Sequence, residues 1–294
     1  MPSTSSSIAS RPAEASVKHG GFVSARPAAE VAPLLRWAGS KKKLLPLLER
    51  AAPATMRRYI EPFAGSAVLF LRLNPSRAIL SDINEDLIDT YRAVRDEPGQ
   101  IWSLAQDLGT AESDYYRIRA IDPGTLDTQA RAARFVYLNR FCFNGVYRTN
   151  AQGAFNVSRG KGCLSIPSRE VFERFARRLR KVSVRCSDFE STISHAESGD
   201  FAYLDPPYAG MGTRDRGEYG PGSFKDFDLE RLAHSLLQAS ARGAKVLLSY
   251  AEHPPLLRLL RGWQVHRLSV GRNVAGFTGS WHLANEVLVS NYRW

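Results

Sequence analysis

The sequence has only three cysteines in 294 residues, and no two of them form a C-x-x-C pair. They are Cys142, Cys163 and Cys186. An odd number without ligand spacing argues against a disulfide framework and against a structural zinc site, and it is typical of a reducing cytoplasm. No apolar run approaches the roughly 20 residues that a membrane-spanning helix needs. We therefore expect a cytoplasmic protein with no membrane segment and no bound metal.

Residues 1–32 have almost no large apolar side chains and are rich in Ser, Ala and Pro. Such a segment cannot bury enough apolar surface to offset the entropy of ordering it, so we expect a disordered N-terminal extension. The whole chain has 44% hydrophobic and 23% charged residues, which is ordinary for a globular protein. Its length allows one large domain with a smaller insert.

Acidic residues are too few to balance the basic ones, and the net charge is +11. The excess is concentrated, because residues 111–181 carry 14 Lys and Arg but 6 Asp and Glu, whereas residues 182–294 carry 12 of each. Such a concentration indicates a surface that faces phosphate groups, and hence a nucleic-acid partner. A solvated basic face is the other interpretation, because a run of charge does not specify a partner.

Short apolar runs and amphipathic segments alternate over residues 33–97 and again over residues 182–294. This rhythm predicts a Rossmann-like α/β sheet. The alternation is interrupted over residues 98–181. We therefore predict a catalytic domain made of residues 33–97 and 182–294, with residues 98–181 as a mainly helical insert between them. Strands are expected at 58–61, 77–80, 182–186, 201–204, 245–250, 263–270 and 286–291. Helices are expected at 41–50, 67–73, 85–95, 101–108, 113–120, 128–141, 169–180 and 228–242, with a glycine-rich hairpin at 144–162.

The first strand is followed by the turn Phe63-Ala64-Gly65-Ser66. Small residues there let a ligand approach the backbone and the N-terminus of the next helix. Asp82 comes 19 residues after Phe63, at the end of the second strand, where a carboxylate accepts hydrogen bonds from a ribose diol. Turn and acid together predict a cofactor that contains adenosine, although an ordinary tight turn would look the same by itself. The chain has no G-x-G-x-x-G motif, which argues against NAD.

The apolar run Phe201–Leu204 ends in Asp205-Pro206-Pro207-Tyr208. Prolines fix φ near −65° and supply no N–H, so the carbonyls of Asp205 and Pro206 are free to face a pocket beside the Tyr208 ring. A carboxylate, two rigid carbonyls and an aromatic plate form a receptor for a flat heterocycle that carries an amino group. A proline-terminated strand with a packed tyrosine is the alternative.

Several motifs carry a family resemblance. Asp205 to Tyr208 resembles motif IV of the DNA amino-methyltransferases, and Glu61 to Gly65 is similar to motif I of the adenine-specific members. Trp37 to Lys41 resembles the N-terminal motif of the Dam-type class, and Asp82 to Leu87 resembles its motif II. Residues 141–145 and 153–157 are similar to its target-recognition insert, and residues 286–292 to its closing strand. Residues 33–294 thus resemble the Dam-type (D12 class, α-group) DNA adenine-N6 methyltransferases.

This resemblance implies a transfer of methyl groups from S-adenosylmethionine to N6 of adenine in double-stranded DNA. It implies that Lys41 binds the methionine carboxylate and that Phe63 contacts the adenine of the cofactor. A packed tryptophan, a solvated lysine and a helix-capping aspartate are the alternatives for Trp37, Lys41 and Asp82. The implied cofactor-binding residues are Trp37, Lys41, Phe63, Gly65, Asp82, Asp188 and Asp205. The expected DNA contacts are Arg140, Asn144, Arg148, Arg159 and Lys161.

The amino group of adenine is a poor nucleophile because its lone pair is delocalised into the ring. Hydrogen bonds to the Asp205 carboxylate and the Pro206 carbonyl favour a pyramidal nitrogen, so we expect Asp205, Pro206, Pro207 and Tyr208 to form the catalytic centre. The base must leave the duplex to reach it, and Tyr208 is expected to stack on the flipped base. The glycine-rich loop 209–223 suits a mobile flap. N4-cytosine methylation is an alternative, and so is a non-catalytic DNA-binding relative that kept the basic insert.

Two positions depart from the family pattern. Ala67 stands where the family has the second glycine of motif I. Ser158-Arg159-Gly160-Lys161 replaces the Pro-Phe-Gly pattern that is common in Dam enzymes, and this bears on the target sequence more than on the chemistry. The resemblance suggests G-A-T-C as the target and a monomer encoded by a bacterium or a phage. It does not distinguish a restriction-modification role from a repair or phage role.

Overall fold

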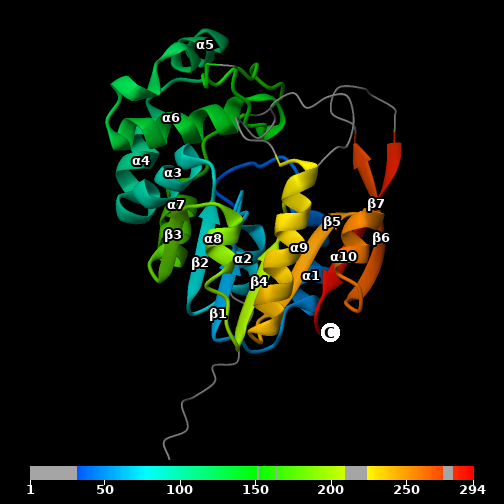
Figure 1. Ribbon diagram of the computed structural model, residues 1–294. Helices are drawn as coiled ribbons and strands as arrows, with labels where there is room; N and C mark the ends of the chain where they lie inside the picture. Colours follow the sequence, from blue (N-terminus) through cyan, green and yellow to red (C-terminus); the bar gives the residue numbers. More distant parts are fainter. Residues whose placement is uncertain (1–31, 151, 163, 209–223, 274–280) are drawn as a thin grey trace, which may run out of the picture.

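The computed structural model describes residues 32–150, 152–162, 164–208, 224–273 and 281–294. Figure 1 shows an α/β sheet with a mainly helical part above it. Residues 1–31 and 209–223, for which disorder and a mobile flap are predicted, lie outside the described residues. Within the described part of the chain, no helix is both long enough and apolar enough to cross a bilayer.

A seven-stranded sheet in the order β3-β2-β1-β4-β5-β7-β6 forms the centre of the fold. The strands from β3 to β5 are parallel, while β7 runs antiparallel to β5 and to β6. Parallel neighbours on both sides of β1 require helical crossovers, so this order confirms the predicted Rossmann-like sheet. The strands are β1 (Arg58–Glu61), β2 (Ala78–Asp82), β3 (Val182–Cys186), β4 (Asp200–Leu204), β5 (Lys245–Ala251), β6 (Gln264–Asn273) and β7 (Trp281–Ser290).

Helices cover both faces of this sheet (Figure 1). Successive side chains of a strand point to opposite faces, and in β4 Phe201 and Tyr203 join one apolar core while Ala202 and Leu204 join the other. Because both faces are buried, the central strands read as continuous apolar runs in the sequence. The first face is covered by α1 (Leu45–Ala51), α2 (Val68–Leu73), α3 (Glu85–Asp96) and α7 (Arg169–Leu179). The second is covered by α8 (Phe189–Ile193), α9 (Asp226–Ala241) and α10 (Pro254–Leu259).

The predicted insert stands beyond the carboxyl ends of the strands, above the sheet in Figure 1. Its helices are α4 (Pro98–Gln106), α5 (Glu112–Ala120) and α6 (Thr128–Phe141). Both α4 and α6 pack against α3, and Ile101 and Val136 belong to the same apolar core as the sheet. A smaller core joins α5 and the end of α6 to the following hairpin. Since α7 also packs on α3 and β3, the domain limits at residues 98 and 181 stay a prediction.

Two short helices, α8 and α10, have no counterpart in the sequence prediction. Each is too short to show a helical period, but both begin at a side chain that caps the first turn. Asp188 accepts a hydrogen bond from the Glu190 amide at 3.0 Å, and His253 accepts one from the Leu256 amide at 3.3 Å. The capping at Asp188 places its carboxylate at the carboxyl edge of the sheet, where the site lies.

Candidate active site

A cavity of about 320 Å³ opens at the carboxyl ends of β1, β2 and β4. The chain order of the parallel sheet changes direction at β1, and open α/β sheets bind their ligands at such a point. Segments far apart in the sequence meet there. The walls include Trp37, Lys41, Phe63, Gly65, Asp82, Asp188, Asp205, Pro206, Pro207 and Tyr208, which are all the residues that the sequence assigns to the cofactor and to catalysis.

The turn after β1 exposes backbone to the cavity. Gly65 has φ +43°, and a Cβ atom there would lie 2.8 Å from Cδ1 of Trp37, so glycine leaves room for the indole ring. The Tyr91 hydroxyl donates a hydrogen bond to the Gly65 carbonyl and holds the turn. Ala67, directly before α2, also has a left-handed backbone with φ +51°. Alanine therefore keeps the glycine-like conformation at the position where the family has glycine.

Asp82 ends β2 and is held by the same turn. Its Oδ2 accepts a hydrogen bond from the Gly65 amide, and its Oδ1 accepts one from the Asn84 amide, both at 3.1 Å. Burial raises the pKa of Asp82, and these backbone amides oppose the shift. Each carboxylate oxygen has a second lone pair, so this fixed carboxylate is able to accept hydrogen bonds from a diol.

Glu61, the last residue of β1, is a buried acid in the cavity wall. The residue is 3% exposed, and among the described residues its Oε2 has no hydrogen-bond partner. Burial raises the pKa of Glu61 well above its usual range; the nearby Tyr59 hydroxyl opposes the rise, and the Asp205 and Asp82 carboxylates add to it. The Tyr59 hydroxyl is too poorly placed to form a hydrogen bond, since it also has no partner among the described residues. A buried oxygen without a donor is costly, so it marks a position for a donor or a cation from a ligand.

Three phenylalanines line an apolar slot on one side of the cavity. Phe63 stacks on Phe189 with ring centroids 5.5 Å apart, and Phe224 meets Phe63 edge-on at 6.1 Å. At the rim, Asp188 accepts a hydrogen bond from Arg231 Nη2 at 2.9 Å, and the Arg231 guanidinium lies 4.9 Å from the centre of the Phe189 ring. An aromatic slot rimmed by fixed polar groups suits a flat heterocycle.

Asp205 follows β4 and is anchored through one of its oxygens. Oδ1 accepts a hydrogen bond from Lys41 Nζ at 2.7 Å and another from the Ser249 hydroxyl at 2.9 Å. Ser249 is fully buried on β5, and its oxygen lies 3.0 Å from the Tyr203 hydroxyl. Within the described residues Oδ2 has no donor, so Oδ2 is the oxygen that is available to a ligand.

The ion pair between Lys41 and Asp205 is largely shielded from water, with side-chain exposures of 7% and 19%. Burial disfavours the Lys41 ammonium, but the Asp205 carboxylate outweighs this effect, and the pKa of Lys41 lies above its usual value. Burial also raises the pKa of Asp205, against the pull of Lys41 and Ser249. The sequence assigns Lys41 to a methionine carboxylate; in the structure its partner is Asp205.

The rest of the Asp205–Tyr208 motif lines the cavity mouth. Pro206 is buried, and Pro207 and Tyr208 are half-buried. The Tyr208 ring stands edge-on to Tyr250, with 5.0 Å between centroids and 85° between planes. The Lys41 ammonium lies 5.5 Å from the Tyr208 centroid. These contacts fix the orientation of the tyrosine ring beside Asp205.

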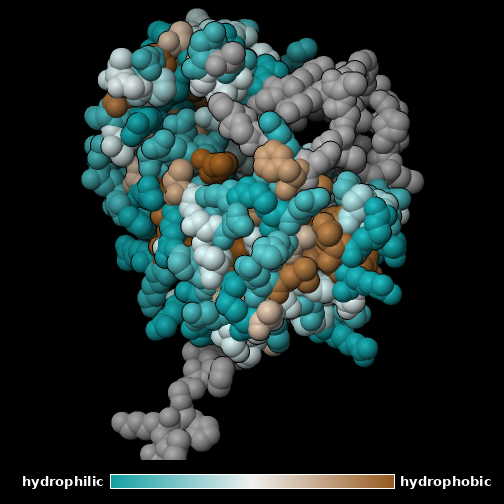
Figure 2. Space-filling model, in the orientation of Figure 1, coloured by the Kyte–Doolittle hydropathy of each residue, from teal (hydrophilic) through white to brown (hydrophobic). Residues whose placement is uncertain are grey.

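Large apolar side chains are exposed around the cavity. Ile83 is 63% exposed and Phe227 is 60% exposed, although both line the cavity. Figure 2 shows brown, apolar surface in the middle of the molecule, where the upper helical part meets the α/β part. Exposed apolar groups that gather at a cavity mark a binding surface.

The expected DNA contacts belong to the end of α6 and the segment that follows it. The predicted hairpin is present there, since Thr149 pairs with Phe155 and Cys142 pairs with Arg159 in antiparallel bridges. Asn144 and Lys161 have exposed side chains. Both are therefore free to meet a ligand without leaving a buried position.

The three arginines of this group are bonded within the protein. Arg148 Nε donates to Asn156 Oδ1 at 2.7 Å. Arg159 donates to the Thr110 carbonyl at 3.0 Å, and Arg140 donates to the Ser165 carbonyl at 3.3 Å. These guanidiniums brace the hairpin in the free protein, and their contacts with DNA stay a prediction.

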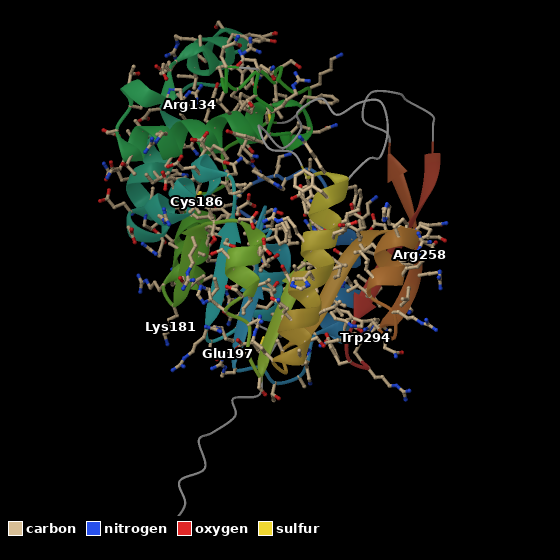
Figure 3. The ribbon with its side chains drawn as sticks, viewed as in Figure 1. Arg134, Lys181, Cys186, Glu197, Arg258 and Trp294 are labelled. Carbon is tan, nitrogen blue, oxygen red and sulfur yellow. The ribbon has the colours of Figure 1, made fainter. Side chains whose placement is uncertain are left out.

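The basic excess of residues 111–181 is divided between two edges of the molecule. The basic residues of 177–181 close α7 and lead into β3. In Figure 3, Lys181 lies at the lower edge of the sheet, whereas Cys186, at the other end of β3, lies toward the helical part. Lys181 therefore lies away from the helical part, and a phosphate-facing surface on the rest of the segment stays a prediction.

Sequence reasoning gave no role to Glu61, Asn139, Tyr147 or Ser249, all of which shape the site. Ser249 is a polar residue inside the apolar strand β5, and Asn139 is a polar residue among the buried positions of α6. A lone polar residue in a buried element was the available signal, because such a group needs a specific partner. The identity of that partner depends on packing and is absent from local sequence.

Comparison with known proteins bears on the same residues. Residues 37–274 match the family model of the D12 class N6 adenine-specific DNA methyltransferases. The Type II methyltransferase M1.LlaDCHI of Lactococcus lactis subsp. cremoris is 32% identical over 270 residues, which cover 88% of this chain and 95% of the relative. The Type II methyltransferase M.MjaIII of Methanocaldococcus jannaschii is 31% identical, with coverages of 83% and 93%. The DNA adenine methylase of Escherichia coli K12 is 31% identical, with coverages of 86% and 93%.

The family match includes every residue that lines the cavity, from Trp37 to Arg231. It names adenine N6 as the methylated atom, and this decides against the alternative of N4-cytosine methylation. Relatives from bacteria and from a phage carry names of DNA adenine methylases or N-6-adenine-methyltransferases. The chain belongs to the D12 class N6 adenine-specific DNA methyltransferase family and is an enzyme that methylates adenine in DNA.

Proposed function

We propose that this enzyme transfers a methyl group from S-adenosylmethionine to N6 of an adenine that has been flipped out of double-stranded DNA. The observation that carries the proposal is the Asp205 carboxylate, which is anchored through Oδ1 and has Oδ2 available in the cavity wall. The N6 amino group of a base placed there meets a hydrogen-bond acceptor of fixed position. The cofactor slot and the base receptor then share one cavity.

The residues of the cavity fit S-adenosylmethionine. The unpartnered Oε2 of Glu61 suits the α-ammonium group, and the fixed carboxylate of Asp82 suits the ribose diol. The slot of Phe63 and Phe189 suits the adenine ring, and the absent side chain of Gly65 lets the ligand approach the backbone. When bound, the cofactor supplies a methyl group that its sulfonium already activates. Lys41 is not assigned to the methionine carboxylate, because its ammonium is held by Asp205.

The residues around Asp205 prepare the amino group for attack. Oδ2 of Asp205 and the carbonyl of Pro206 accept hydrogen bonds from the two N–H groups, which localises the nitrogen lone pair. Positive charge develops on the nitrogen as it attacks, and the carboxylate stabilises that charge. As the carbon–sulfur bond breaks and the carbon–nitrogen bond forms, the nitrogen gives up one proton to solvent, which leaves neutral N6-methyladenine. Lys41 holds Asp205 in place and opposes the pKa rise that burial causes. Holding the reacting atoms in line contributes the remaining acceleration.

The base reaches this receptor only by leaving the helix stack, because Asp205 and Pro206 line a cavity that a paired base cannot enter. Tyr208, fixed edge-on by Tyr250, is placed to stack on the extruded base. Such a stack contributes roughly 1–3 kcal/mol. The exposed Asn144 and Lys161 are the first DNA contacts that we assign, and Arg140, Arg148 and Arg159 join them by exchanging their internal acceptors for phosphates or base edges.

The test of this function is the variant Asp205→Asn. It keeps the shape of the side chain but removes the charge, so we expect methyl transfer to fall by about 10²–10³-fold. Binding of DNA, measured by fluorescence anisotropy, should change little. Nucleoside analysis of DNA methylated by the wild-type enzyme should show N6-methyladenine. Wild-type activity in Asp205→Asn would sink the assigned role.

Calorimetric titration of the wild-type protein with S-adenosylmethionine tests the proposed cofactor directly, because a protein without the proposed cofactor site would show no binding heat. Sequencing DNA from a host that expresses the protein, with detection of modified bases, gives the target sequence. Methylation of G-A-T-C is the first pattern to look for, and another pattern would point to Ser158–Lys161 as the cause.

A further inference from the structure

A side-chain amide connects the recognition segment to the chain that covers the cofactor cavity. Asn139 lies in the last turn of α6 and is 4% exposed. Its Oδ1 accepts a hydrogen bond from the Arg36 amide at 2.8 Å, and its Nδ2 donates to the Arg36 carbonyl at 2.6 Å. One side chain thereby satisfies both backbone groups of Arg36, across 103 positions of sequence. Arg36 lies outside the described helices and strands, so its backbone N–H and C=O groups are not satisfied by regular secondary structure.

Two more contacts from the same segment fall on the same short stretch. Gly145 has φ +67°, and a Cβ atom there would lie 2.4 Å from Cβ of Arg36. The Tyr147 ring stacks on Trp37 with 6.2 Å between centroids and 16° between planes. The Tyr147 hydroxyl donates to Asp86 Oδ2 at 2.9 Å, which ties the stack to α3. Residues 139–147 therefore hold the Arg36–Trp37 stretch from three sides.

The other neighbour of Trp37 is the cofactor turn. Its indole lies against Gly65, at the distance where no side chain fits between them. Trp37 thus stands between Tyr147, at the entrance of the hairpin, and Gly65, in the wall of the cavity. Asn144, Arg148, Arg159 and Lys161, which we assign to DNA contacts, belong to the same hairpin (residues 144–162) as Tyr147. A movement of the hairpin on DNA is therefore transmitted through Tyr147 and Trp37 to Gly65 in the cavity wall.

We propose that Asn139 is a positioning residue that holds Trp37 over the cofactor turn and links the placement of the recognition hairpin to the affinity for S-adenosylmethionine. This rests on the function proposed above. We call the two hydrogen bonds between Asn139 and Arg36 the clamp. The clamp acts on cofactor binding and not on the reacting atoms, because Asn139 forms no hydrogen bond to Asp205 or Tyr208 within the described residues. Its loss therefore raises the dissociation constant of the cofactor while the chemical step is largely kept.

The variant Asn139→Ala tests the clamp. Two hydrogen bonds are lost, so we expect the Kd for S-adenosylmethionine to rise about tenfold by titration calorimetry. The kcat at saturating cofactor should stay within about threefold, so that the change appears in KM. The fluorescence of Trp37 is obtained by subtracting the spectrum of a matched Trp37→Phe protein. In the wild-type protein this signal should respond to the cofactor, and in Asn139→Ala the response should be lost. A purely structural role would lower the Tm and leave Kd unchanged.

Asn150→Ala is the matched control. Asn150 lies in the hairpin, and its side-chain Oδ1 accepts hydrogen bonds from the nearby amides of Gln152 and Ala154. Removing it deletes the same chemical group without touching Arg36 or Trp37, so cofactor affinity should stay within about twofold. If Asn139→Ala does not fold, Tyr147→Leu replaces it, because Tyr147 is only half-buried and its loss removes the stack on Trp37.

The link to DNA is measured by repeating the titration with sheared duplex DNA that lacks N6-methyladenine. We expect the duplex to change the Kd of the cofactor in the wild-type enzyme, and this change to shrink in Asn139→Ala, because coupling between two ligands is reciprocal. A folded Asn139→Ala variant with wild-type cofactor affinity overturns the proposal, and so does a wild-type Kd that duplex leaves unchanged. A wild-type protein that binds no cofactor at all overturns the proposed function instead.

Discussion

At the scale of single residues, the Asp205 carboxylate, to which we assign the catalytic role, depends on neighbours that lie far from it in sequence. Asp205 receives one donor from the N-terminal motif and one from β5. Both act on Oδ1, and no donor from the described part of the chain contacts Oδ2, the oxygen that we propose acts on substrate. One oxygen of the carboxylate thus fixes its position while the other can accept a hydrogen bond from a ligand. The two donors, Lys41 and Ser249, can be mutated separately.

The first prediction concerns Ser249. Ser249→Ala should lower kcat by about tenfold, because a hydrogen bond to a charged group contributes about 1.5–3 kcal/mol. The KM for the cofactor should change by less than about twofold, since Ser249 contacts Tyr203, Leu204 and Asp205 and none of the residues to which we assign the cofactor. Steady-state kinetics measure both. Ser290→Ala is the control, because it also removes a buried hydroxyl of the sheet, one bonded to the Tyr292 carbonyl. Equal losses in the two variants would contradict the assignment.

The second prediction concerns pH and Glu61. Burial raises the pKa of this carboxyl group, so the free protein holds it protonated above the ordinary carboxylate range. A bound ammonium group favours the ionised form and lowers that pKa, so cofactor binding releases a proton and tightens as pH rises toward the raised pKa. Glu61→Gln should weaken binding and reduce this slope. The number of protons released on cofactor binding is measured by titration calorimetry in two buffers that differ in ionisation enthalpy.

Some slope should remain in Glu61→Gln, because burial also raises the pKa values of Asp82 and Asp205. Stability of the free protein should show the opposite sign. A raised pKa means that ionised Glu61 disfavours folding, so wild-type stability falls relative to Glu61→Gln as pH rises above the ordinary carboxylate pKa. Identical pH profiles of cofactor affinity in the two proteins would refute the role of Glu61.

At the scale of elements, periodicity and motifs predicted most of the fold. Helix Thr128–Phe141 and strands Arg58–Glu61 and Val182–Cys186 have the expected bounds, because each is apolar on the faces that it buries. The short α8 and α10 were missed, since five or six residues carry no period. The positions of Asp82 and Asp205 followed from motifs at strand ends. Ser249 and Asn139 did not, because their partners are set by strand pairing and helix packing.

The start of α2 allows a further prediction. Ala67 has φ +51°, a conformation that costs a residue with a side chain about 1–2 kcal/mol. Ala67→Gly relieves this strain but loses a buried methyl group and adds freedom to the unfolded chain, so its unfolding free energy should change by less than about 1 kcal/mol. Ala67→Val should destabilise by about 2 kcal/mol or more, because a β-branched residue tolerates this backbone poorly. Denaturant unfolding measures both, and a stable Val variant would contradict the account.

At the scale of the whole molecule, the two basic edges should differ in their response to salt. Lys161 is exposed beside the hairpin, and Lys181 lies at the lower edge of the sheet in Figure 3. Lys161→Ala should reduce the slope of log Kd for DNA against log salt by about 1, the value for one lost phosphate contact. Lys181→Ala should leave the slope unchanged. Anisotropy titrations at several salt concentrations measure the slope for each variant. A slope that falls in Lys181→Ala and not in Lys161→Ala would show that DNA binds at the edge that carries Lys181.

The strand order has a consequence for how the chain is made. β5 is complete at Ala251, but its neighbour β7 begins only at Trp281 and enters between β5 and β6. Until β7 pairs with it during folding, β5 has an open edge of unpaired backbone groups, which is the kind of edge that pairs with other chains. Ser249 lies on that strand and pairs with Leu288 of β7. The pairing of β7 therefore both closes the edge and completes the strand that supports Asp205.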